Sequence, residues 1–218
     1  MRRLLIFGLV TALAGGAPGP RPEERPAKDF WSQPELDAVI EVANFNRALM
    51  AAAIFHETNR VRASLRLRRF RALPKLDDAA DLEAAVGRVY QPPSHTNPFP
   101  LIGTPASRVE YVGLKASRVA ENIALLPIYE VDPRLGVGTT VRAGRQVAIN
   151  PATRTELKPA TYRGFAAAVV KAWMDSPGHR ANIIDPRLTC LGCSVQPAVN
   201  ILSVDNLFCV QVFFTPAD

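Results

Sequence analysis

The 218-residue sequence is poor in histidine and cysteine, with three of each, and two common hydrolase motifs are missing from it. Neither a His-Glu-x-x-His pair nor a Gly-x-Ser-x-Gly turn occurs, which excludes a zinc-protease helix and a serine-hydrolase elbow. No stretch after the N-terminus approaches the roughly 20 apolar residues that a membrane helix needs. What is present is 48% hydrophobic residues, enough for a packed core, with 19 prolines and 13 glycines that favour long loops.

The N-terminus has the pattern of a secretory signal. Arg2 and Arg3 precede an apolar run from Leu4 to Ala14, which is too short to span a bilayer and is followed by small residues. We predict a signal peptide over residues 1–17, a flexible Pro-rich linker over 18–33 and a single domain over 34–218. The alternative is an uncleaved anchor. No cysteine follows the apolar run, so a lipoprotein is not expected, and the protein is predicted to be exported to the periplasm or the extracellular space.

The positive charge of the chain is unevenly distributed. The net charge is +6, and removal of Arg2 and Arg3 with the signal lowers it to +4. Six arginines lie between Arg60 and Arg71, and such a cluster is able to bind an anionic surface. The alternative is a solvated helix end whose arginines pair with Asp77, Asp78 and Asp81. Few aromatic residues accompany the cluster, so no nucleic-acid partner is expected.

The three cysteines, Cys190, Cys193 and Cys209, all lie in the last thirty residues. The spacing of Cys190 and Cys193 is that of half a zinc or redox motif, but no second pair exists. In an exported protein a disulfide from Cys209 to one of the other two is favoured. If the C-terminal hairpin is centred on Ile201, Cys193 faces Cys209, and we predict that these two form the bond.

Hydrophobic periodicity predicts helices and an antiparallel sheet, an α+β domain. Apolar residues recur at helical spacing from Asp37 to about Arg69, from Asp77 or Asp78 to Tyr90, and from Thr161 to Met174. Residues 117–125 are either a short helix or an extended segment. Short β-branched runs within 127–159 indicate a hairpin insertion. The last strand is apolar on both sides, so it is predicted to be central.

Four segments, in order, resemble the CAP superfamily of cysteine-rich secretory proteins, antigen 5 and pathogenesis-related proteins (SCP-like domains). The four are Asn59-Arg60 with Leu73-Pro74-Lys75-Leu76, then Ser94-His95, then Glu121-Asn122-Ile123-Ala124, and last Trp173 with residues 176–184. The spacing from His179 to Cys193 also fits the family. The resemblance covers about residues 54–214 and implies an α-β-α sandwich with a central antiparallel sheet.

The resemblance also implies a cleft lined by histidines and acidic residues. Carried over to this sequence, these are His95, Glu121 and His179. The fourth, acidic position is occupied by Ser176, with Asp175 beside it. Two imidazoles and a carboxylate are a possible ligand set for zinc or another divalent cation, and they are also able to perform acid–base chemistry. The alternative is that these residues only hold the fold together.

Three functions are therefore in competition. The first is a secreted protein that binds a ligand, such as a lipid, a peptide or a cell-wall component, through this cleft, with or without a divalent metal. The second is a cleft hydrolase acting on peptide or cell-wall material, which we favour less than a non-enzyme. The third is an electrostatic binder of anionic surfaces that uses the Arg60–Arg71 cluster. We further expect a monomer.

Overall fold

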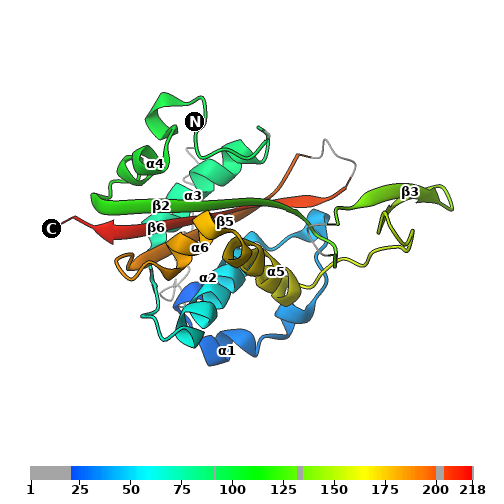
Figure 1. Ribbon diagram of the computed structural model, residues 1–218, viewed down its shortest axis with the longest axis horizontal. Helices are drawn as coiled ribbons and strands as arrows, with labels where there is room; N and C mark the ends of the chain where they lie inside the picture. The colour runs from blue at the N-terminus through cyan, green and yellow to red at the C-terminus, as the bar shows by residue number, and fades with distance from the viewer. Residues whose placement is uncertain (1–20, 91, 132–134, 200–203, 218) are drawn as a thin grey trace, which may run out of the picture.

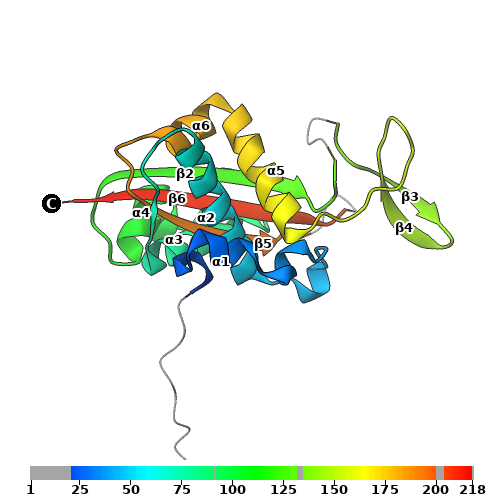
Figure 2. The same cartoon turned by 90° about the horizontal axis from the view of Figure 1, so that it is seen from below.

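The computed structural model describes residues 21–90, 92–131, 135–199 and 204–217. A four-stranded sheet runs through its centre, and helices cover both faces (Figure 1). One layer holds α3 (Pro74–Gly87) and α4 (Pro105–Tyr111). The other holds α1 (Ala27–Trp31), α2 (Arg47–Ser64), α5 (Tyr162–Asp175) and α6 (Pro177–Ile184), as the view from below shows (Figure 2). The predicted α+β class and the α-β-α layers are confirmed.

The sheet has the order β1-β5-β6-β2. Its strands are β1 (Arg71–Ala72), β2 (Ala116–Pro127), β5 (Cys190–Pro197) and β6 (Asn206–Pro216). The last strand is central, as predicted, and its residues are apolar on both sides because a helix layer lies over each face. However, β1 runs parallel to β5, so the sheet is mixed and not purely antiparallel. The segment 117–125, left open between helix and strand, is extended and belongs to β2.

The predicted disulfide between Cys193 and Cys209 is wrong, because all three cysteines are free thiols. In the β5–β6 pair Cys209 faces Val195, while Cys193 faces Gln211. The register therefore differs by two residues from the one centred on Ile201, a residue that lies outside the described part of the chain. A shift of two residues keeps both thiols on the same face of the sheet but places them on a diagonal.

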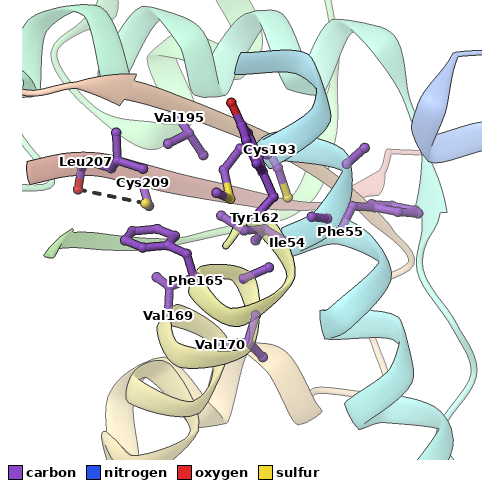
Figure 3. Packing of buried hydrophobic residues seen from close by; sticks show 14 of the residues in the cluster. Ile54, Phe55, Tyr162, Phe165, Val169, Val170, Cys193, Val195, Leu207 and Cys209 are labelled. Carbon is purple, nitrogen blue, oxygen red and sulfur yellow. Dashed lines mark hydrogen bonds between the residues drawn. The ribbon is translucent and has the colours of Figure 1, made fainter. Parts of the chain in front are cut away.

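The larger core lies between the sheet and the α2–α5 layer. Cys193, Val195 and Cys209 face Ile54 of α2 and Phe165 of α5 (Figure 3). Burial raises the pKa of the Cys209 thiol, so this cysteine is a packed apolar residue and not a reactive one.

The N-terminal segment differs from the expected flexible linker. Residues within 18–33 form the 3-10 turn η1 (Pro22–Glu24) and the helix α1, and Phe30 is fully buried. The Phe30 ring stacks on the imidazole of His56, with 4.1 Å between ring centroids. A further 3-10 turn, η2 (Pro34–Asp37), ends where the long helix was predicted to begin, and another, η3 (Val42–Asn44), lies within its first part. The helix itself begins only at Arg47, where Asn46 accepts a hydrogen bond from the amide of Leu49.

The predicted insertion contains a two-stranded hairpin, β3 (Gly138–Arg142) and β4 (Arg145–Ile149). It projects beyond one end of the central sheet (Figure 1). Its tight turn has Ala143 and Gly144 at positive φ, the backbone that a two-residue hairpin turn requires.

The arginines from Arg60 to Arg71 do not form one free basic surface. Arg62 is 1% exposed, donates hydrogen bonds to the carbonyl groups of Ile183 and Arg68, and lies over the Phe70 ring. Arg60 pairs with Glu57. The expected partners Asp77 and Asp81 pair instead with arginines outside the cluster, Arg21 and Arg47.

Among the described residues, no helix is long and apolar enough to cross a membrane.

We predict that Gly192→Ala destabilises the protein severely. A Cβ at Gly192 would lie 2.2 Å from the carbonyl carbon of Leu76, because α3 packs directly on β5 at this point. Backbone is unable to move aside as a flexible side chain does, so we expect a loss of about 3 kcal/mol or more in the free energy of unfolding. Urea denaturation measures it. Gly178→Ala, where nothing lies within 4 Å of the new Cβ, is the matched control and should cause no loss.

Candidate functional site

Three of the predicted site residues converge on the free edge of the sheet. Among the described strands β2 pairs only with β6, so its other edge carries no neighbour. His95 reaches this edge from the loop that follows α3, on one face of the sheet, and Glu121 lies on β2 itself. His179 lies in the first turn of α6, which packs against β2 from the other layer. The site is therefore built from both helix layers around one strand.

His95 and Glu121 form a direct hydrogen bond. The Nδ1 atom of His95 lies 2.9 Å from Oε1 of Glu121. The Glu121 side chain is 1% exposed, whereas that of His95 is 52% exposed. A carboxylate accepts and does not donate, so Nδ1 of His95 carries a proton in this contact. The other ring nitrogen, Nε2, forms no hydrogen bond with a described residue.

The Glu121 carboxylate is held from the other side by Arg108 of α4, which is fully buried. Nη2 of Arg108 donates to Oε2 of Glu121 at 2.6 Å, and Nη1 lies 2.8 Å from Oε2 of Glu83 on α3. Asn97 donates a further hydrogen bond to Glu83 at 3.0 Å. One guanidinium thus bridges two buried carboxylates. Burial raises the pKa of Glu83, so the carboxylate that favours a cationic His95 is mainly that of Glu121, which is bonded to the ring.

The environments of the two histidines move their pKa values apart. The hydrogen bond to Glu121 raises the pKa of His95. Burial, and then the charge of His95, lower the pKa of His179. His95 therefore keeps its second proton to a higher pH than His179 does. In its imidazolium form His95 is a donor at Nε2.

A chain of buried amides and a hydroxyl holds α6 against the sheet. Asn122 of β2 donates to the carbonyl oxygen of His179 at 3.2 Å and to Oε1 of Gln211 at 3.2 Å. Gln211 donates to Oγ1 of Thr58 on α2 at 2.7 Å. Asn182 of α6 donates to Oδ1 of Asn122 at 2.9 Å and to the carbonyl oxygen of Glu121 at 3.2 Å. Such a satisfied buried network fixes geometry, and it sets the position of His179 relative to Glu121.

Asp175 and Ser176, the other two predicted site residues, do not join the His95–Glu121 pair. The Asp175 side chain is 64% exposed and pairs with Lys171 one helical turn earlier. Ser176 lies between α5 and α6, where its carbonyl oxygen accepts from the amide of Arg180. No contact among the described residues joins either one to the His95–Glu121 pair.

The predicted metal site is not supported. No group of three or more His, Cys, Asp or Glu in the described part of the chain is arranged to hold a metal ion. Both oxygens of Glu121 are already engaged, one with His95 and one with Arg108. With its carboxylate committed to a guanidinium, the trio of His95, Glu121 and His179 does not fit the ligand set that zinc requires.

Sequence reasoning missed Arg108, Glu83 and the polar chain. Arg108 has no local signature, because its two carboxylate partners come from other elements that only the fold brings together. Asn122 and Asn182 were within motifs already noted, and their polarity beside apolar neighbours was the available signal. Gln211, flanked by apolar residues in a strand buried on both faces, was a similar clue.

A model of the cysteine-rich secretory protein (CAP) family matches residues 55–213. Similar solved structures include an extracellular SCP-domain protein from Bacillus anthracis, 19% identical, covering 77% of this chain and 41% of that one, TM-score 0.48. An outer surface protein from Borrelia burgdorferi is 16% identical; the match covers 83% of this chain and 99% of that one, with a TM-score of 0.48. A cysteine-rich secretory protein from Staphylococcus aureus is 10% identical; the match covers 78% of this chain and 40% of that one, with a TM-score of 0.46. The chain spans less than half of the Bacillus and Staphylococcus structures. No curated protein matches the sequence.

We predict that Arg108→Met costs about 3–5 kcal/mol of unfolding free energy, because it leaves two buried carboxylates without their cation. Chemical denaturation followed by circular dichroism measures the loss. Arg118→Met is the matched control, since Arg118 is 42% exposed and its Asp185 contact is 4.0 Å long. That control should change stability by less than about 1 kcal/mol. Equal losses for the two variants would contradict the proposed importance of the buried guanidinium.

Glu121→Gln should bring the two histidine pKa values closer together. Loss of the carboxylate lowers the pKa of His95, and the smaller charge on His95 allows the pKa of His179 to rise. Proton NMR titration of the ring signals measures both. A raised folded pKa means that His95 contributes stability below its unfolded pKa, about 6.5, and that this contribution is lost as pH rises through the folded pKa. Glu121→Gln should flatten that part of the stability profile, and an unchanged profile would contradict the assignment.

Proposed function

Because the chain belongs to the cysteine-rich secretory protein (CAP) family, we propose that it is an exported protein that binds an acidic group of its ligand at the free edge of β2. The observation that carries this proposal is the half-exposed His95, held from behind by the buried Glu121 and Arg108. When it is protonated on both nitrogens, a ring fixed in this way offers the N–H of Nε2 outward. An imidazolium donor is suited to a carboxylate or a phosphate.

His179 and the backbone around it form the other side of the proposed binding site, opposite His95. Its ring is half-buried and neutral, so it is able to accept or donate one hydrogen bond beside His95. The polar chain through Asn122 fixes the position of His179 relative to β2, and so relative to His95. A prearranged donor and a neutral neighbour favour recognition of a defined polar group, since little conformational freedom is lost on binding.

The hydrolase alternative has less support. A covalent mechanism needs a nucleophile within hydrogen-bond reach of a base. In the described part of the chain, neither His95 nor His179 forms a side-chain hydrogen bond with a hydroxyl or a thiol. The electrostatic alternative is also weaker, because Arg62 of the Arg60–Arg71 cluster is buried and Arg60 is paired.

Export is part of the proposal and rests on the sequence of residues 1–17, which lie outside the described residues. An exported protein meets peptides, lipids and cell-wall polymers, and each of these classes has members with a carboxylate or a phosphate. We place the acidic cell-wall and peptide ligands first, because a single imidazolium with one N–H matches one carboxylate.

Two matched pairs of small molecules test the acidic group. N-acetylmuramic acid differs from N-acetylglucosamine by a lactyl carboxylate, and N-acetylalanine differs from its methylamide by its charge. In NMR titrations we expect the acidic member of at least one pair to shift the ring signals of His95 and His179, and the neutral member to leave them in place. His95→Ala should abolish the response, while Ser94→Ala, a change at the neighbouring exposed residue, should keep it. Responses that are equal for acidic and neutral members, or that survive His95→Ala, would contradict the proposal.

A further inference from the structure

We propose that a second site, formed by α1, the C-terminal half of α2 and β1, binds a small amphipathic anion with a flat apolar body. The site is a cavity of about 500 Å³. That volume lies within the range of about 300–1,000 Å³ typical of small-molecule pockets. It shares no residue with the His95–Glu121 site, so the two proposals stand or fall separately.

The interior of this cavity is apolar and aromatic. It is lined by Trp31 of α1, by Phe55 and Ala63 of α2, and by Phe70 and Ala72 at β1. Phe55 and Phe70 are 5% and 3% exposed, so they form the packed apolar backing of the cavity, and the accessible apolar surface comes from the partly exposed Trp31 and the exposed Ala63. An indole face of this kind stacks on a flat ring or packs along an aliphatic chain.

His56 adds one polar atom to this wall. The residue is 5% exposed, and its ring stacks on Phe30. Its Nε2 lies 3.1 Å from the carbonyl oxygen of Pro22, which is able only to accept, so Nε2 carries the proton. Burial lowers the pKa of His56, which favours the neutral ring with an unprotonated Nδ1. No described residue donates a hydrogen bond to that atom, so the polar contribution of His56 to this wall is that of an acceptor.

The rim of the cavity carries charges of both signs. Arg25, Arg60 and Arg69 lie on it with Glu23 and Glu24, and both glutamates pair with Arg21, which also pairs with Asp77. Arg60 is balanced by Glu57. Arg25 donates a hydrogen bond to Gln33 at 2.7 Å, whereas Arg69 forms no ion pair or side-chain hydrogen bond with any described residue, so the Arg69 guanidinium is available for an anion. An apolar surface beside this free arginine selects a ligand with one anionic end and an apolar body.

The test uses a fluorescent pair that differs by one charge. The anionic probe is 8-anilinonaphthalene-1-sulfonate, and N-phenyl-1-naphthylamine has the same rings and N–H without the sulfonate. We expect saturable binding of the anion to the folded wild-type protein. Arg69→Glu should weaken it about tenfold, as the loss of a charged hydrogen bond does, and should leave binding of the neutral probe unchanged within about twofold.

Two further variants locate the probe. Arg68→Glu makes the same charge change at the adjacent exposed residue, which does not line the cavity, and it should leave anion affinity unchanged. Ala63→Trp fills the cavity from an exposed position on α2 and should abolish binding of both probes, with circular dichroism confirming the fold. The proposal is overturned if Arg68→Glu weakens binding as much as Arg69→Glu, if Ala63→Trp leaves binding intact, or if the wild-type protein does not bind the anion.

Discussion

The contact on which the site most depends is the buried guanidinium of Arg108 between Glu83 and Glu121. A carboxylate that is 1% exposed is stable as an anion only if a cation and hydrogen bonds replace water. Arg108 supplies both, and by reaching two carboxylates it also ties α4 to α3 and to β2. Its Nε has no hydrogen-bond partner among the described residues. The fold therefore accepts one unsatisfied N–H, at a cost of about 1–3 kcal/mol, in order to keep Glu121 charged beneath His95.

The second constraint is the open edge of β2. Because β6 is covered on both faces and paired on both edges, the polar groups of a ligand have access to the sheet only where a strand lacks a neighbour. β2 is such a strand, and the two helix layers bring one histidine each to its edge. The buried chain from Thr58 through Gln211 and Asn122 to Asn182 makes α6 part of this arrangement. Arg108 thus sets the charge and direction of His95, and the amide chain sets the place of His179.

Much of this was predictable from the sequence. The ordered motifs gave the family, the layers and three site residues, and the two-sided apolar pattern of β6 gave its central place. Register was not predictable, because slipping the β5–β6 pair by two residues keeps every side chain on its face and changes only which cysteine faces which residue. The fold of residues 22–31 was hidden by their charged, Pro-rich composition, since Phe30 is the only buried residue among them. Arg108 was hidden because its partners are distant in sequence, and reasoning from local patterns finds only local partners.

The free thiols and the engaged carboxylate of Glu121 differ from two expectations that the sequence raised. Cys193 and Cys209 act as small apolar residues within the core, and the two oxygens of Glu121 are engaged by His95 and Arg108. The histidine-lined edge is backed by the internal Arg108. What that edge offers to a ligand then depends on which ring nitrogen of His95 carries the proton.

Determining which ring nitrogen of neutral His95 carries the proton is therefore the most direct test. In a long-range ¹H–¹⁵N NMR spectrum of the ¹⁵N-labelled protein, recorded above the titration of His95, the account predicts a protonated Nδ1 and an unprotonated Nε2. Neutral histidine in water prefers the opposite form, so the result would show that Glu121 holds the ring. A protonated Nε2 with a bare Nδ1 would mean that the hydrogen bond to Glu121 is absent, and the account of the site would be wrong.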